Sequence, residues 1–354
     1  MKKTCASLLA TLCLAPQLLS TTHAGDGAQP VTELPTVKAD ASGPPIWRFV
    51  RGDRTVLVLG TLQPLPRDVA FVDTGLQSAL AASGAILGSE GVDIGADIGL
   101  FRGLTLWPSI RKTKLIEGGK RLADVVPAED YRRWSELKAR YLPGNDGVER
   151  LRPMYAAWQL YEAALSARGM APGSPVSRQI SSSARKLDLE IVDARYQVKV
   201  RNPKEAVTSF EVDREADLAC FRRTLHDLEP WLDAAPAIAD AWSRGDTATT
   251  SAILETTPRL GRCWARLTNE AIAQAEGVDA ARAAREQWQA ALERATREHP
   301  VLFTTLPLDE LLDGQGSAQA LQAAGFRLEA PAGGIADVSA SELPEPPAPA
   351  GSHR

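Results

Sequence analysis

Few of the residues that most often hold catalytic metals occur in this sequence. Its 354 residues include only four histidines and four cysteines. Patterns of the His-x-Glu, His-Glu-x-x-His and Cys-x-x-Cys types are absent, as are Gly-x-Ser-x-Gly and Walker-type loops. The sequence therefore lacks the signatures that mark zinc proteases of the His-Glu-x-x-His type, dithiol proteins, serine hydrolases and P-loop proteins.

The histidines that are present do not form a group in the sequence. His226 falls in the middle of an expected helix, where a surface or packing role is the usual one. His299 follows a long helical pattern and is expected to cap that helix. His353 lies in the C-terminal tail, and we expect none of the three to bind a metal.

Long apolar runs are missing outside the first 24 residues. Lys2 and Lys3 precede a mostly apolar stretch, Ala6 to Leu19, and Thr22-His23-Ala24 offers small residues for cleavage. This order is typical of a secretory signal peptide, and the stretch is shorter than the about 20 residues of a membrane-spanning helix. We expect a periplasmic or secreted protein, cleaved near Ala24, with no membrane span.

An excess of basic charge is also missing. Cleavage after Ala24 would remove two of the 40 basic residues and none of the 44 acidic ones, leaving a formal net charge of −6. Nucleic-acid binding needs a concentrated basic patch. We therefore expect no nucleic-acid partner.

Two cysteines, Cys220 and Cys263, remain after cleavage of the signal peptide. In an oxidising compartment an even pair is a candidate disulfide, here joining two expected helices. The alternative is two isolated buried thiols, and export favours the disulfide.

The ends of the mature chain differ in composition from its middle. Residues 25–43 are rich in Gly, Pro, Ala and Asp without periodicity, and residues 331–354 are rich in Pro and Ala. Such segments are typical of flexible leaders and tails. The folded domain is expected at 44–330.

A β-hairpin opens this domain and leads to the position of greatest interest. Trp47 to Val50 and Thr55 to Leu59 are apolar runs on either side of the turn-forming residues 51–54. The second run is typical of a strand buried on both faces. It ends at Gly60-Thr61, where a missing Cβ allows a bend or a close approach, and it places Gln63 at the strand's end.

Helical periodicity dominates the rest of the chain, so we predict an α/β fold with a large helical middle section. An aromatic stripe, Tyr155, Trp158 and Tyr161, is expected to face the core. The predicted helices are 73–83, 127–141, 149–168, 204–231, 262–299 (with a possible break at Gly277) and 317–324. The remaining predicted strands are 85–87, 190–192, 300–303 and 325–328.

The hairpin and the residues after it resemble the first motif of the TraB/GumN family, which is related to the Tiki-type proteases and to the ChaN and erythromycin-esterase folds. That motif reads Gly-Thr-x-His with a Leu-Pro soon after, and its histidine is thought to help hold a divalent metal. This chain reads Gly60-Thr61-Leu62-Gln63. The resemblance implies a central mixed β-sheet flanked by helices and a site at the strand ends, but glutamine replaces the expected ligand.

Other motifs of the family are also altered. Where the family has Gly-x-x-His-Leu before its last helix, this chain has Thr304 for Gly and Pro307 for His, and proline has no side-chain donor or acceptor. The family's strand-end glutamate corresponds to Ser89 in a straight register; Glu90 is one residue late, and only a bulge would bring it to the same face. Arg195 stands where a carboxylate is usual.

A helix junction shared with the family is kept. Residues 242–246 resemble its Trp-x-x-Gly-Asp, although a C-cap glycine followed by an N-capping Asp246 would explain the same residues.

These changes favour an exported pseudoenzyme with no metal or other cofactor, which binds a peptide, glycan or protein in the cell envelope. If the alignment is right, the Cβ atoms of Gln63 and Pro307 lie within ~10 Å, since each metal–ligand bond would span only ~2 Å. The positions expected to line the former site are Gly60, Thr61, Gln63, Glu90, Arg195, Thr304 and Pro307.

Two alternatives remain open from the sequence. An active metal-dependent hydrolase would need a rebuilt site that uses Glu90, Gln63, Asp93 or Asp97. A purely structural envelope component is the other.

Overall fold

The computed structural model describes residues 43–71, 73–95, 108–171, 173–208 and 210–329. The predicted signal peptide, the leader up to residue 42, the tail and also Asp97 lie outside these ranges. No helix within them combines the length and the apolar character needed to cross a membrane.

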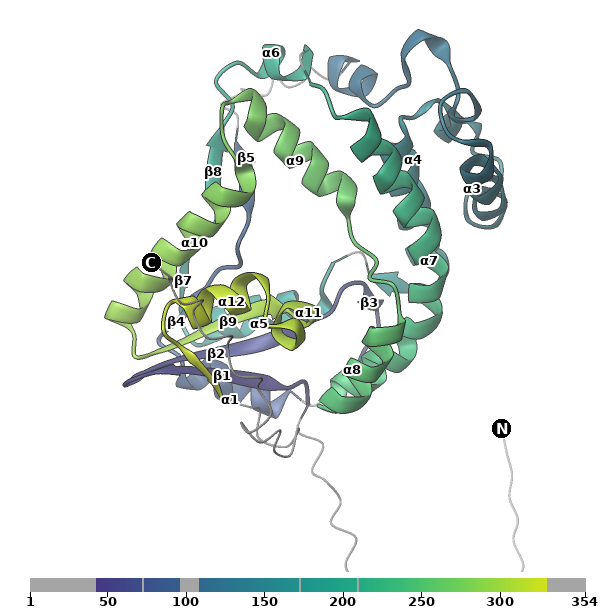
Figure 1. The fold of residues 1–354 in the computed structure, drawn as a ribbon. Helices are drawn as coiled ribbons and strands as arrows, with labels where there is room; N and C mark the ends of the chain where they lie inside the picture. Colours follow the sequence, from purple (N-terminus) through teal and green to yellow (C-terminus); the bar gives the residue numbers. More distant parts are fainter. Residues whose placement is uncertain (1–42, 72, 96–107, 172, 209, 330–354) are drawn as a thin grey trace, which may run out of the picture. The chain divides into compact units, whose positions relative to one another are not determined.

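A mixed six-stranded sheet forms the centre of the described domain (Figure 1). Its strand order is β10-β1-β2-β9-β4-β7, with β10, β1 and β2 antiparallel and β2, β9, β4 and β7 parallel. The strands are β1 (Ile46–Arg51), β2 (Arg54–Thr61), β4 (Ala85–Leu87), β7 (Glu190–Val192), β9 (Val301–Pro307) and β10 (Arg327–Glu329). The α/β fold with a mixed central sheet is thus confirmed.

Two small two-stranded sheets accompany the main one. They pair β3 (Leu65–Pro66) with β6 (Met170–Ala171), and β5 (Val92–Gly95) with β8 (Tyr196–Lys199).

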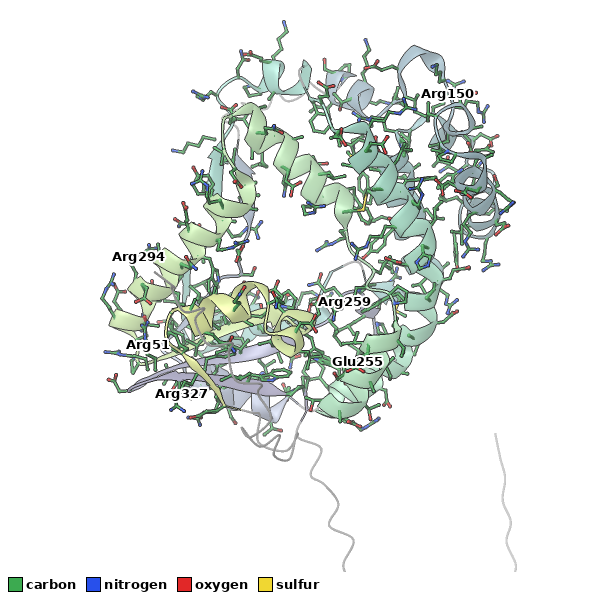
Figure 2. The ribbon with its side chains drawn as sticks, viewed as in Figure 1. Arg51, Arg150, Glu255, Arg259, Arg294 and Arg327 are labelled. Carbon is green, nitrogen blue, oxygen red and sulfur yellow. A yellow bond between two sulfur atoms is a disulfide. The ribbon has the colours of Figure 1, made fainter. Side chains whose placement is uncertain are left out.

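The predicted hairpin is formed by β1 and β2, and β2 is the buried strand that its sequence indicates. Val56, Val58 and Leu59 are fully buried, because β2 lies between β1 and β9 and is covered by helices. Beside the turn, Arg51 stacks on Phe326 and pairs with Glu293 at 2.7 Å (Figure 2).

Helices cover the sheet and build the middle of the chain. α10 and α1 contact sheet strands, while α3, α4, α7 and α9 pack against one another. The α-helices that lie wholly within the described ranges are α1 (Thr74–Ala82), α3 (Ala128–Tyr141), α4 (Pro153–Ala167), α5 (Pro175–Lys186), α6 (Pro203–Thr208), α7 (Arg214–Ser243), α8 (Thr247–Thr256), α9 (Cys263–Ala275), α10 (Ala280–Glu298), α11 (Leu308–Asp313) and α12 (Gly316–Ala323). Residues 108–113 are also helical, and 3₁₀ turns occur at Glu117–Gly119, Leu122–Asp124 and Asp146–Arg150.

The prediction of one helix over 204–231 is wrong. The segment forms two helices, α6 and α7. The Asp213 side chain accepts the backbone N–H of Ala216 and so caps the N-terminus of α7. α7 then continues to Ser243 through Pro230 and Pro236. Burial of large side chains along α7 outweighs the local cost of a helix-interior proline.

Gly277 separates the last long helical pattern into two helices, as its position suggested. Its φ is +75°, a left-handed conformation that favours glycine, and it lies between the end of α9 and the start of α10.

The predicted disulfide is present between Cys220 on α7 and Cys263 at the start of α9 (Figure 2). The two Cα atoms lie 5.6 Å apart. At the neighbouring junction, the Asp246 carboxylate accepts the N–H of Thr249, so this residue caps α8.

The aromatic stripe on α4 is only partly core. Tyr155 and Tyr161 are buried as expected, but Trp158 is half-buried and lines a cavity. Periodicity identifies the face of a helix, whereas the packing of other elements decides how much of that face is covered.

Candidate functional site

The carboxyl ends of four parallel strands, β2, β9, β4 and β7, meet at one edge of the main sheet. In α/β folds, ligands bind outside this end of the strands. We call this the carboxyl edge.

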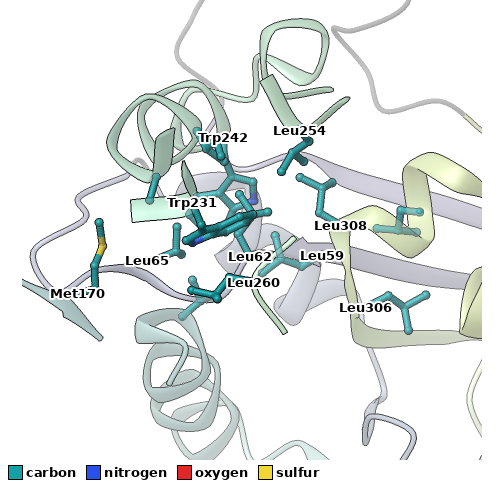
Figure 3. Close-up of a cluster of buried hydrophobic side chains, with 14 of the residues drawn as sticks. Leu59, Leu62, Leu65, Met170, Trp231, Trp242, Leu254, Leu260, Leu306 and Leu308 are labelled. Atoms are coloured by element: carbon teal, nitrogen blue, oxygen red, sulfur yellow. The ribbon is translucent and has the colours of Figure 1, made fainter. Parts of the chain in front are cut away.

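Gly60 and Thr61 at the end of β2 contact neighbouring elements at the carboxyl edge. A Cβ atom on Gly60 would lie 2.7 Å from Cζ3 of Trp47 and 2.8 Å from Cδ1 of Leu308, so only glycine fits without a shift. The Gly60 carbonyl accepts the indole N–H of Trp242 at 2.9 Å, and the Thr61 hydroxyl donates to the Leu306 carbonyl. Figure 3 shows the apolar cluster around this strand end.

The structure brings Gln63 and Pro307 to this same edge from adjacent strands. Thr61 is paired directly with Pro307, and Gln63 follows Thr61 by two residues. β9 therefore runs four residues beyond the predicted end at 303. Gln63 is exposed, and its Oε1 accepts a hydrogen bond from Nη2 of Arg262 at 3.4 Å. The ~10 Å separation of the two Cβ atoms stays a prediction.

Thr304 does not reach the carboxyl edge. It is fully buried in the interior of β9, and its hydroxyl donates to the Leu87 carbonyl at 2.9 Å. Its contribution is to link β9 to β4.

Glu90 lies beyond the end of β4, so strand alternation does not determine its direction. The loop turns its half-buried carboxylate toward α12, where Oε2 accepts the Ser317 hydroxyl at 3.2 Å. The period-two register of a strand therefore does not apply at Glu90, and its correspondence to the family's glutamate stays a prediction.

A second carboxylate, missed in the sequence, shares this serine with Glu90. Oε2 of Glu310 on α11 accepts the Ser317 backbone N–H at 2.8 Å. Burial raises the pKa of Glu310, and the negative charges of Asp309 and Glu90 raise it further, against the opposing effect of the Ser317 N–H. The sequence does not predict this pairing, because Glu90 and Glu310 are 220 positions apart. The only local signal is that a short acidic helix, α11, follows β9.

Arg195 follows β7 and contacts strand β5. Its Nε donates to Oδ1 of Asp93 at 2.6 Å, and its Nη2 donates to the Val92 carbonyl. The Asp93 carboxylate also accepts the Gln197 amide. A guanidinium and one of the candidate metal-binding carboxylates thus neutralise each other beside the carboxyl edge.

The two histidines within the described residues lie away from the carboxyl edge. His226 is exposed on α7, and His299 ends α10 at the amino end of β9. There its Nε2 lies 3.4 Å from Oε2 of Glu190, and ligand atoms of Glu190, Glu298 and His299 all fall within 4.8 Å of one another. These residues could hold a metal ion, but both glutamates are exposed, and exposed acidic groups of this kind are common without one.

Comparison with known proteins gives one result for this chain. No curated protein and no solved structure matches it significantly. The model of the TraB/PrgY/gumN family matches residues 45–305, from the first strand of the hairpin into β9, and the chain therefore belongs to this family.

Proposed function

We propose that this protein is an exported pseudoenzyme of its family, which binds a peptide, glycan or protein of the cell envelope without metal chemistry. Two of the side chains at the carboxyl edge that could offer an oxygen to a metal are instead paired with guanidinium groups, and this pairing carries the proposal. Gln63 accepts from the Arg262 guanidinium, and Asp93 accepts from that of Arg195.

The residues present do not fit the divalent metal that the family implies. Pro307 has no side-chain atom that can coordinate a metal. A divalent cation bound at Gln63 would sit beside the positive charge of Arg262 and would have to displace its hydrogen bond. We therefore derive no metal-dependent step.

Export is supported by the disulfide, since structural disulfides persist in oxidising compartments. It is also supported by the basic and apolar residues at the start of the sequence.

Metal titration of the mature protein, purified in chelator and followed by calorimetry and elemental analysis, tests the proposal. We expect zinc and manganese to bind no more tightly than to any acidic surface. The double change Gln63→His and Pro307→His should introduce weak binding, because it adds two imidazoles at one edge but none of the groups that orient them.

The matched control is Gln274→His with Gln322→His, which adds two histidines on separate helices, α9 and α12. This control should gain no binding beyond the wild type. Tight, stoichiometric zinc or manganese in the wild-type protein would refute the pseudoenzyme proposal.

An active hydrolase with a rebuilt carboxylate site is the second candidate, and the pairing of Glu90 with Glu310 through Ser317 favours it. A carboxyl group of raised pKa beside a second carboxylate is the arrangement that general acid–base catalysis uses. Peptide hydrolysis that disappears in both Glu90→Gln and Glu310→Gln would support this candidate. Hydrolysis unchanged in both would show that the activity arises elsewhere.

A further inference from the structure

A cavity of about 490 Å³ lies between α4, α6, α9 and the strand pair β5–β8. Its volume falls in the range of roughly 300–1,000 Å³ that holds small-molecule ligands. Aromatic side chains form much of its wall: Tyr155 and Trp158 from α4, Phe210 from the segment before α7, and Trp264 from α9. The cavity therefore offers an apolar surface larger than a single side chain would fill.

Two cationic side chains line this apolar cavity. Nζ of Lys114 lies 5.0 Å from the ring centroid of Trp158 and 5.5 Å from that of Tyr155. Arg262 lines the cavity as well, and its side chain donates to the neutral amide of Gln63.

These two cations have no acidic partner within the described ranges, where neither Lys114 nor Arg262 forms an ion pair with a carboxylate. The cavity has one acidic lining residue, Glu162, which is exposed on α4. The lining thus carries more positive than negative charge, against the acidic balance of the whole chain.

This combination selects a particular kind of ligand. Apolar walls favour a hydrocarbon chain, because burying apolar surface releases roughly 25 cal/mol per Å². Lys114 is half-buried and has no carboxylate partner in the described ranges, so it gains from an anion, since hydrogen bonds to charged groups are among the stronger ones. A cationic ligand would be repelled by Lys114 and Arg262.

We propose that the cavity binds a single-chain amphiphile with an anionic head group. The chain lies against Trp158, Phe210 and Trp264, and the carboxylate or phosphate head accepts from Lys114 or Arg262. A free fatty acid and a phosphate monoester lipid share this chemistry. The inference goes beyond the proposed function, because it holds whether or not the carboxyl edge is catalytic.

Calorimetry on the mature protein with four probes that each carry a twelve-carbon chain tests the proposal, with the ionic probes below their micellar concentrations and the alcohol below its solubility limit. The probes are dodecanoate, dodecyl phosphate, dodecanol and dodecyltrimethylammonium. We expect saturable one-to-one binding of an anionic probe, with dodecanol about tenfold or more weaker, in line with the strength of charge-assisted hydrogen bonds. If dodecanoate binds more tightly than dodecyl phosphate, the ligand class is a fatty acid. If dodecyl phosphate binds more tightly, the ligand class is a phosphate monoester lipid.

Three variants separate the cavity from non-specific adsorption. Lys114→Met with Arg262→Met should remove the preference for the anion and keep the weak binding of dodecanol. Ala265→Trp, at a position on α9 that lines the cavity, should occupy part of the space and weaken the binding of every probe. Arg266→Met is the matched control: it removes an exposed arginine of the same helix that pairs with Glu270, outside the cavity, and should leave affinities unchanged.

Circular dichroism of each variant verifies that it is folded. The proposal is overturned if neither anion binds the wild type, if the cationic probe binds as well as the anions, or if folded Ala265→Trp binds dodecanoate as tightly as the wild type.

Discussion

Gly60 shows how a single position at the end of β2 sets the spacing of the carboxyl edge. Trp47 and Leu308 occupy the space where its Cβ atom would be, and Trp242 bonds to its carbonyl. Trp47 is on β1 and Leu308 is on α11, so a residue without a side chain lets these two elements approach the strand, while α7 supplies Trp242. Glycine in this motif is therefore explained by packing.

Gly60→Ala should destabilise the protein by ~1–3 kcal/mol, the usual cost of forcing a methyl group into a packed core. Chemical unfolding of the mature protein measures this. Gly173→Ala is the control, because no atom lies within 4 Å of the Cβ that it adds. Equal stability of the two variants would show that Trp47 and Leu308 move aside at little cost in free energy.

Glu310 is the residue at the carboxyl edge whose ionisation opposes folding. Its pKa is raised by burial and by Asp309 and Glu90, so the folded state favours the protonated carboxyl. The cost of the charged form is absent below the pKa of the unfolded chain and grows as the pH rises through the folded pKa.

Glu310→Gln should therefore gain stability relative to the wild type as the pH rises from about 4 to 7. The amide oxygen of glutamine can still accept the Ser317 N–H. Unfolding followed across this pH range measures the trend. Glu255→Gln, at an exposed position on α8 (Figure 2), should show none; a flat difference for Glu310→Gln would mean that its carboxyl is well solvated.

At the scale of elements, the disulfide joins two helices that build both the middle of the chain and the surroundings of the site. Cys220 is buried on α7, and Cys263 is next to Arg262, which lines the cavity and bonds to Gln63. The bridge thus positions the start of α9 beside the carboxyl edge.

Labelling of the unfolded but unreduced mature protein should find no free thiol, and reduction should release two. Replacing both cysteines by serine should lower the free energy of unfolding by ~2–4 kcal/mol, since the bridge closes a loop across 43 positions of the sequence. The reduced wild type should resemble this variant. Two reactive thiols per chain before reduction would contradict the bridge.

At the scale of the whole described domain, the carboxyl edge is assembled from segments far apart in the sequence. Gln63 follows β2, Glu90 follows β4, Arg195 follows β7, and Pro307 ends β9. The parallel strands bring these positions to one edge, while the helical middle section supplies Arg262. Changes at these positions alter the chemistry of the edge and leave the apolar pattern that forms the sheet in place.

Local pattern by itself determined much of this protein. The hairpin, the buried strand β2, the α4 helix and the break at Gly277 follow from periodicity and turn residues, which act over a few positions. The placement of Gln63 and Pro307 at strand ends follows from motif order. The cysteine pair followed from composition and the signal peptide.

Only the tertiary structure decided what each polar group at the edge binds. The pairing of Glu90 with Glu310 through Ser317, of Asp93 with Arg195 and of Gln63 with Arg262 joins segments separated by about 100 to 220 positions. Tertiary packing also keeps α7 helical through two prolines. It leaves Trp158 only half-buried, at the wall of a cavity. Sequence patterns record local preference and burial, whereas the partner of a side chain depends on the fold that brings distant segments together.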